Sequence, residues 1–422
     1  MAGRGRTTRR RAAGRRRTTR RDGARRRAVA ALLGCLLVAS GCSAPPAADA
    51  ATGAIQRTLD RRADALLDRD ETGYLAAVDP EAGDLLAAER RTYRNLADVP
   101  VRSWEYGLRD VERTGTRATA RAELRYRLAG YDSAPVTSSR TLELTERDGR
   151  WYVTADRPGE GGVRQLWQQG PVEVVHGRRS LILGVGQDST RLREIAAAAD
   201  RAVPAVDGAW PGEWAGRVVV LVPASVTSMA GLLGASAASY RGIAAVTTGE
   251  TGPKSSSPAD RVIVNPDAYG LLGDFGRRIV LTHETTHVAT RAATSEATPM
   301  WLSEGFSDWV AYRDTGRTDG QAAPELERSP RRGGAPAALP EDADFAFDAE
   351  ADELARAYEG GRLACELIAE RWGERKLTDF YRAVGEREHR EGAVENALND
   401  VLSVTPDEFG ALWRDHLRER LR

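Results

Sequence analysis

The sequence predicts an α+β protein with two folded regions that are built differently. Between residues 54 and 158, two segments with helical apolar spacing precede four segments in which apolar and polar residues alternate. That order indicates helices packed on an antiparallel sheet. From residue 163 to 422, strands and helices come in turn and a series of helices follows, which indicates a sheet lobe and a helical lobe.

A basic stretch and a short apolar run open the chain. Residues 1–27 contain thirteen arginines, and the apolar run 28–41 that follows has fourteen residues. A membrane-spanning helix needs about 20 residues, so this arrangement is typical of a signal peptide. We therefore expect an exported protein whose signal peptide occupies residues 1–42.

The signal ends in Val-Ala-Ser-Gly-Cys at residues 38–42, which resembles a bacterial lipobox. The resemblance implies that Cys42 is acylated and becomes the mature N-terminus, so that the protein is lipid-anchored on the outer face of the cell membrane. Secretion into the medium is the alternative, and both Sec and twin-arginine export stay open. Residues 43–53, rich in alanine and proline, are expected to form a tether.

The formal net charge of zero hides an asymmetry. Residues 1–27 hold thirteen of the 61 basic residues and one of the 61 acidic ones, so 48 basic and 60 acidic residues remain in the rest of the chain. That part has a net charge of −12. An acidic body argues against nucleic acid as a partner.

Region 54–158 reads as a small accessory domain. Helical spacing predicts helices at 55–67 and 80–97, and alternation predicts strands at 101–111, 117–128, 138–145 and 150–154. This order is similar to the NTF2-like, cone-shaped fold. The region contains no histidine or cysteine, so we interpret it as non-catalytic.

The second region, 163–422, has a pattern that changes along the chain. We expect strands at 172–175, 180–184, 217–222, 242–248 and 261–264, and helices at 189–206, 226–233 and 273–291. Later helices are expected at 351–372, 376–384, 391–401 and 405–421. Residues 315–350, directly before these later helices, are rich in glycine, proline and acids, which predicts a long loop at the border of a cleft.

The helix expected at 273–291 carries the chemistry. His283 and His287 are four residues apart, so they lie on one face and can present their ring nitrogens to a single ion. Glu284 is rotated by roughly 100° around the helix, which suits a carboxylate that touches a metal-bound water and not the metal.

A second helix, expected at 299–310, supplies further carboxylates. Zinc with two histidine ligands needs a third protein ligand and an open position for chemistry, and Glu304 is the candidate. Asp308 lies one turn further along. It can hydrogen-bond the free ring nitrogen of a liganding histidine and fix its tautomer.

The HExxH of residues 283–287, followed by WLSEGFSD at 301–308, resembles the gluzincin metallopeptidases, the group that contains thermolysin and the aminopeptidases related to leukotriene hydrolase. The resemblance implies one Zn²⁺ held by His283, His287 and Glu304. It also implies that Glu284 is the general base in peptide-bond hydrolysis.

A third segment, Tyr-Glu-Gly-Gly at 358–361, is similar to a Tyr-Glu-Lys-Gly segment of the aminopeptidase branch. This similarity implies that the Tyr358 hydroxyl stabilises the oxyanion of the tetrahedral intermediate. No Gly-x-Met-Glu-Asn segment precedes residue 283, so the glutamate that binds a free amine is missing. Endo- and exopeptidase activity both stay open.

Together these features predict an exported zinc metallopeptidase that acts on a peptide or protein substrate in the cell envelope. The alternative is a non-catalytic envelope lipoprotein that uses a peptidase-like fold as a binding or scaffolding module. Glu284 favours the enzyme, because a purely structural zinc site does not need that carboxylate.

Overall fold

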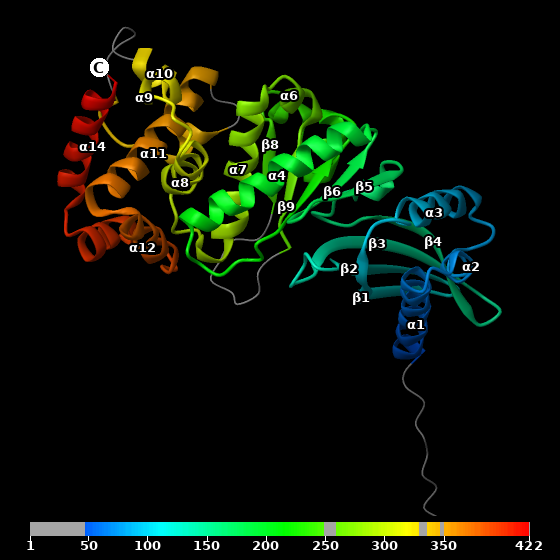
Figure 1. Cartoon of the computed structure of the whole chain (residues 1–422). Coiled ribbons are helices and arrows are strands. Elements are labelled where there is room, and N and C mark those ends of the chain that lie inside the picture. Colours follow the sequence, from blue (N-terminus) through cyan, green and yellow to red (C-terminus); the bar gives the residue numbers. More distant parts are fainter. Residues whose placement is uncertain (1–46, 249–258, 329–335, 347–349, 422) are drawn as a thin grey trace, which may run out of the picture. The chain divides into compact units, whose positions relative to one another are not determined.

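The computed structural model describes residues 47–248, 259–328, 336–346 and 350–421, which form a mixed α+β unit with two sheets (Figure 1). The predicted signal peptide and Cys42 lie outside the described residues. Helix α1 (Ala47–Leu67) starts within the expected tether, so residues 47–53 are helical. Alanine-rich sequence favours that extension.

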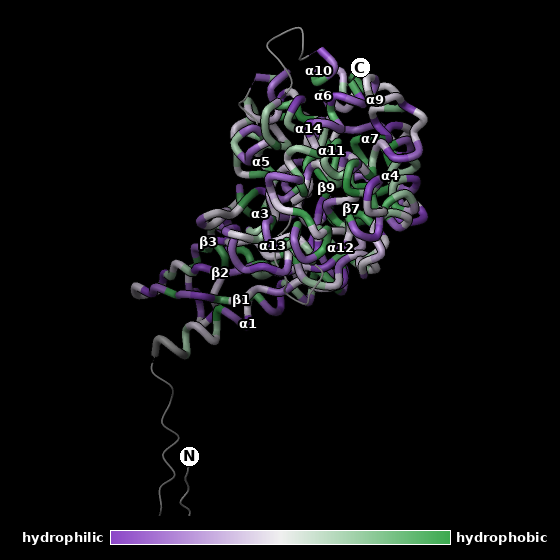
Figure 2. The backbone as a smooth tube through the Cα atoms, turned by 90° about the vertical axis from the view of Figure 1, so that its left-hand side faces the viewer, coloured by the Kyte–Doolittle hydropathy of each residue, from purple (hydrophilic) through white to green (hydrophobic). Residues whose placement is uncertain are grey.

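The first region contains three helices and a four-stranded antiparallel sheet in the order β1-β2-β3-β4. After α1 come α2 (Glu71–Leu75), α3 (Gly83–Asn95), β1 (Val101–Thr114), β2 (Arg117–Leu128), β3 (Val136–Arg147) and β4 (Arg150–Pro158). Apolar and polar residues alternate along β2 (Figure 2), and every second residue of this strand is buried. The pattern therefore predicts the strands correctly, while the short α2 gives no such signal.

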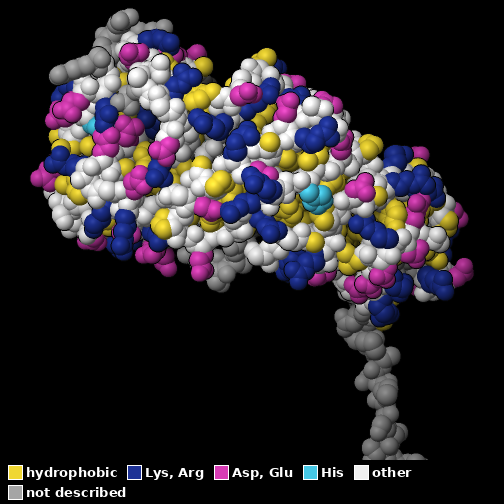
Figure 3. Space-filling model, viewed as in Figure 1, with side chains coloured by type: hydrophobic (Ala, Val, Ile, Leu, Met, Phe, Trp, Pro, Cys, Tyr) yellow, Lys and Arg dark blue, Asp and Glu magenta, His cyan; other side chains and the backbone are white. Residues whose placement is uncertain are grey.

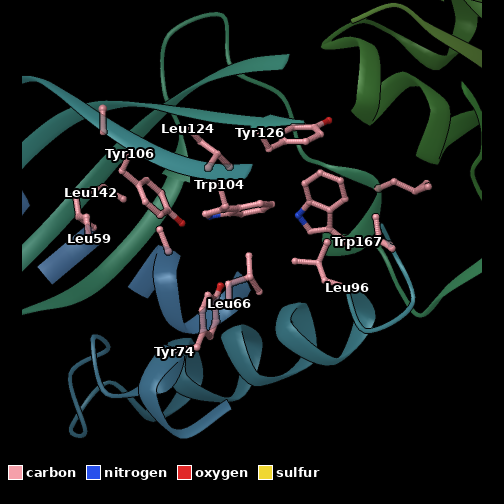
Figure 4. Packing of buried hydrophobic residues seen from close by; sticks show 14 of the residues in the cluster. Leu59, Leu66, Tyr74, Leu96, Trp104, Tyr106, Leu124, Tyr126, Leu142 and Trp167 are labelled. Carbon is pink, nitrogen blue, oxygen red and sulfur yellow. The ribbon is translucent and has the colours of Figure 1, made fainter. Parts of the chain in front are cut away.

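Aromatic side chains fill the space between this sheet and its helices. Trp104 of β1 lies beside Tyr126 and Trp167, with ring centroids 5.8 and 5.6 Å away, and all three side chains are buried (Figure 4). Tyr126 and Trp167 meet edge to face at 5.0 Å. Trp167 comes from a 3₁₀ turn (Leu166–Gln168) beyond β4, so the segment that follows the sheet completes its core.

The second region has a mixed five-stranded sheet in the order β5-β6-β7-β9-β8. Its strands are β5 (Val172–His176), β6 (Ser180–Val185), β7 (Val218–Val222), β8 (Ala245–Thr248) and β9 (Arg261–Val264). Strands β6, β7 and β9 are parallel, and β5 and β8 pair antiparallel at the two edges. The three central strands are buried along their whole length, and apart from their first residues Ser180 and Arg261 they hold no polar side chain, as expected for parallel strands covered on both faces.

Helices cover this sheet and build the rest of the region. They are α4 (Ser189–Ala209), α5 (Val226–Leu233), α6 (Pro266–Gly270), α7 (Asp274–Thr290), α8 (Met300–Tyr312), α11 (Ala351–Trp372), α12 (Glu374–Gly385), α13 (Ala393–Ala397) and α14 (Pro406–Arg420). Helix α7 lies between the sheet and α8, and α8 packs along α11 (Figure 1). No helix among the described residues is long and apolar enough to cross a bilayer.

The expected loop 315–350 contains more structure than its composition predicts. Two short helices, α9 (Asp319–Ala322) and α10 (Pro324–Arg328), and a 3₁₀ turn (Asp342–Phe345) lie within it. The buried carboxylate of Glu359 on α11 accepts hydrogen bonds from the backbone N–H groups of Glu325 and Leu326, at 3.1 and 2.7 Å. The start of α10 is thus capped by a distant residue, which local sequence cannot reveal.

A buried ion pair joins the two regions. Arg261, the first residue of β9, donates to both carboxylate oxygens of Asp132, at 2.8 and 2.7 Å. Asp132 follows β2 and also accepts from the backbone N–H of Leu128. Both charged side chains are almost fully buried, so removing either one leaves the other charge without a partner.

Helices α8 and α11 cross where each has a glycine. A Cβ atom on Gly305 would lie 2.3 Å from the backbone carbon of Gly361, and one on Gly361 would lie 2.6 Å from the carbonyl oxygen of Trp301. These atoms are backbone and cannot rotate away. The two glycines therefore permit the close approach of the helices that carry Glu304 and Tyr358.

We expect Gly361→Ala to destabilise the protein by about 1–3 kcal/mol, because the new methyl group must push two backbones apart. Thermal or urea unfolding measures this loss. Gly208→Ala is the matched control: this helical glycine has no atom within 4 Å of an added Cβ, so the change should be neutral or stabilise by up to about 1 kcal/mol. Equal effects of the two substitutions would contradict the crossing argument.

Candidate metal centre

Helix α7 carries two histidines on a face flanked by threonines. Thr282, Thr286, Thr290 and Thr294 recur every four residues, and each hydroxyl donates to the carbonyl oxygen four residues earlier, at 2.8 to 3.0 Å. This satisfies the hydroxyl groups of Thr282, Thr286 and Thr290 on the buried side of the helix, while Thr294 is half-buried beyond the end of α7. The remaining face presents His283 and His287 toward α8.

Three ligand-type atoms converge between α7 and α8. The Nε2 atoms of His283 and His287 are 3.1 Å apart, and they lie 3.1 and 3.3 Å from Oε2 of Glu304. His283, His287 and Glu304 are largely buried. The structure therefore brings together the three residues that the sequence predicts as metal ligands.

The remaining hydrogen bonds fix the tautomers of both rings. Nδ1 of His283 lies 2.8 Å from Oδ1 of Asp308, which as a carboxylate can only accept, so Nδ1 carries the hydrogen. The Ser307 hydroxyl donates to the carbonyl of Ser303 at 3.0 Å and thus accepts from Nδ1 of His287 at 3.3 Å. In the neutral rings, both Nε2 atoms then present lone pairs.

This donor set fits a zinc ion. Two nitrogen lone pairs and a carboxylate oxygen within 3.3 Å of one another repel unless positive charge lies among them. Ligand atoms at about 2.0–2.2 Å from a tetrahedral ion lie about 3.3–3.5 Å apart, close to the observed separations. Two imidazoles and one carboxylate also form a ligand set that zinc accepts, and they leave a fourth position for water.

The charges around the two rings also favour a cation. Burial lowers the pKa of His283, but the hydrogen bond and charge of Asp308, followed by those of Glu304, outweigh burial and raise this pKa well above its ordinary value. Burial raises the pKa of Glu304, but the neighbouring His287 and His283 hold it far below the usual carboxyl range. Glu304 is therefore ionised, as a metal ligand must be.

The predicted catalytic side chains lie beside this cluster. The ring of Tyr358 on α11 is centred 6.1 Å from the ring of His283 and packs edge to face on Phe345 at 5.2 Å. Burial raises the pKa of Tyr358 well above its ordinary value. The nearby carboxylates of Glu304, Asp308 and Glu284 raise it further, so the phenol keeps its proton.

Two residues of the centre have no predicted role in the sequence. Ser307 orients His287, and its one signal is its place on α8, three residues beyond Glu304 and on the same face. Thr247 of β8 donates to Oε2 of Glu284 at 2.6 Å. Nothing in the sequence around Thr247 distinguishes it from its neighbour Thr248.

A second cluster of metal-ligating residue types lies on α11 and α14, where Glu366, Glu370 and His416 approach one another. Arginine side chains already compensate these carboxylates: Arg362 donates to Glu366 at 2.6 Å, and Arg420 pairs with Glu370. Two guanidinium groups at the same place disfavour a further cation. We interpret the cluster as an ion-pair network that holds α14 on α11.

Comparison with known proteins identifies no relative by sequence: no family model and no curated protein matches the chain. Similar solved structures include an NTF-2 like protein of unknown function from Shewanella oneidensis MR-1, with 15% identity over 25% of this chain and 96% of that one, and a TM-score of 0.21. RPA3114, a SEC-C motif containing protein from Rhodopseudomonas palustris, has 17% identity over 25% and 90%, with a TM-score of 0.20. Likenesses this weak carry no argument about function.

We expect Asp308→Asn to lower zinc affinity by about 10- to 100-fold, because the substitution removes the negative charge that orients His283. Titration with a competing chelator measures this affinity. His287→Ala is the comparison, since loss of a direct ligand should abolish stoichiometric binding. Full zinc occupancy in His287→Ala would remove this residue from the ligand set.

Proposed function

We propose that this protein is an exported zinc metallopeptidase of gluzincin type. The observation that carries the proposal is the convergence of His283, His287 and Glu304, with Glu284 on the same helix and Tyr358 across from it. A structural zinc site closes its fourth position with another protein ligand. Here a proton acceptor and a hydroxyl donor lie beside the three ligands, as hydrolysis requires.

Each residue has a role that follows from its position. His283, His287 and Glu304 would hold Zn²⁺, which when bound lowers the pKa of a water molecule and polarises a carbonyl group. Glu284 accepts a proton from the attacking water and later returns it to the leaving amine. Asp308 and Ser307 keep the two imidazoles in the tautomer that binds metal.

Tyr358 suits the oxyanion that forms when water attacks a peptide carbonyl. Its raised pKa keeps the hydroxyl protonated at neutral pH, so it can donate a hydrogen bond to a developing negative charge. A phenol surrounded by carboxylates has no favourable charged form. It therefore acts as a donor and not as a base.

The proposal includes the cell envelope as the place of action. Its support is the signal-like segment 1–42 with Cys42 at its end, so we propose a lipid anchor at Cys42 and a peptide or protein substrate outside the membrane. On the face that Figure 3 shows, acidic and basic side chains are interspersed over the described residues. Nucleic acid is not part of the proposed function.

We expect Glu284→Gln to retain zinc but to lower the turnover number by about 10³-fold or more, because the proton acceptor is lost while the ligands stay. Digestion of a peptide library, with zinc measured on the same samples, tests this. If the zinc-loaded wild type and Glu284→Gln are equally inactive on every peptide, the peptidase proposal fails and a binding or scaffolding role replaces it.

We expect Tyr358→Phe to lower kcat by about 10²-fold with little change in KM, since the hydrogen bond forms mainly in the transition state. Tyr269→Phe is the control, because among the described residues the buried Tyr269 hydroxyl has no hydrogen-bond partner. A silent Tyr358→Phe would mean that another group stabilises the oxyanion.

A further inference from the structure

Thr247 contacts Glu284 at two points. Its Oγ1 lies 2.6 Å from the carboxylate atom Oε2 and 3.1 Å from the main-chain carbonyl oxygen of the same residue. A threonine hydroxyl has one proton, and both of these neighbours are acceptors. The shorter distance and the negative charge of the carboxylate favour Oε2 as the acceptor, so the Thr247 hydroxyl donates a charge-assisted hydrogen bond to it.

The strand that carries Thr247 is held in place independently of α7. Strand β8 is the edge of the five-stranded sheet and pairs antiparallel with β9, with Thr247 opposite Val262. Arg261, at the start of β9, forms the buried ion pair with Asp132 of the first region. The hydroxyl of Thr247 therefore comes from a strand that is paired into the sheet, and its β-branched side chain has few rotamers to lose.

This contact restricts how Glu284 can act. The side chain of Glu284 is buried and its backbone is fixed in α7, so the hydroxyl of Thr247 sets the rotation of the carboxylate. Because Oε2 accepts the hydrogen bond from Thr247, Oε1 is the oxygen left to take a proton from water. Without the hydroxyl, the carboxylate could turn away from the productive position.

We infer that Thr247 is a positioning residue for the general base of the proposed peptidase. The inference rests on the proposed function, because it assigns to Thr247 the orientation of Glu284 during proton transfer. Misplacing a catalytic group by about 1 Å can cost roughly 10²-fold in rate. Both hydrogen bonds that the Thr247 hydroxyl forms with described residues go to Glu284 and none goes to a metal ligand or to Tyr358, so its effect should appear in turnover and not in metal binding.

Three variants test this in the zinc-loaded, full-length protein. Thr247→Val keeps the shape and removes the hydroxyl; it should lower kcat by about 10- to 100-fold, with KM and zinc content unchanged. Thr247→Ser restores the hydroxyl and should recover kcat to within about 3-fold of wild type. Thr248→Val is the control, because the Thr248 hydroxyl donates to the carbonyl of Arg261, away from the centre. Wild-type kcat in Thr247→Val, or no recovery in Thr247→Ser, would overturn the inference.

A second measurement does not depend on activity. Thr247→Val should lower the melting temperature by about 2 °C or more when Glu284 is present, because a buried carboxylate loses its donor. In a Glu284→Ala background the same substitution should have almost no effect. If the wild type cleaves no peptide, the proposed function fails, whatever the melting temperatures are. Equal melting-temperature losses in the two backgrounds would reject the positioning role of Thr247, whether or not the protein cleaves peptides.

Discussion

The contact between Gly305 and Gly361 is the constraint on which the centre depends. It lets α8 and α11 approach at backbone distance, so that Glu304 on one helix and Tyr358 on the other reach the same small space beside α7. Side chains at either position would separate the helices and widen that space. Close packing of two helices thus sets the distance between a metal ligand and a hydroxyl donor, which neither helix could set alone.

Around the two imidazoles the protein gathers three carboxylates and gives each a different partner. Glu304 faces both Nε2 atoms, Asp308 holds Nδ1 of His283, and Glu284 accepts from Thr247. Buried negative charges at this density are unfavourable without compensation. The divalent cation that we propose between the rings would compensate them, and the separate partners keep the carboxylates from exchanging roles.

The sequence predicts the parts of this centre that depend on helical periodicity. The spacings from His283 to His287 and from Glu304 to Asp308 are local, so one segment is enough to place each pair on a helix face. Thr247 could not be predicted, because it meets Glu284 through the packing of β8 on α7, across a sequence separation of 37 residues. The short helix α10 was missed for a similar reason: its cap, Glu359, comes from another helix. The two sheets and most helices followed their apolar patterns.

The first region contributes to the centre without any ligand of its own. Its Asp132 compensates Arg261, Arg261 begins β9, and β9 pairs with β8, which carries Thr247. A buried ion pair is weak evidence for added stability, but breaking it by removing one partner leaves an uncompensated charge in the interior. Arg261 would be that charge if Asp132 alone were replaced by an uncharged residue. We therefore interpret the accessory sheet as an integral support of the edge strand over α7, and not as a detachable module.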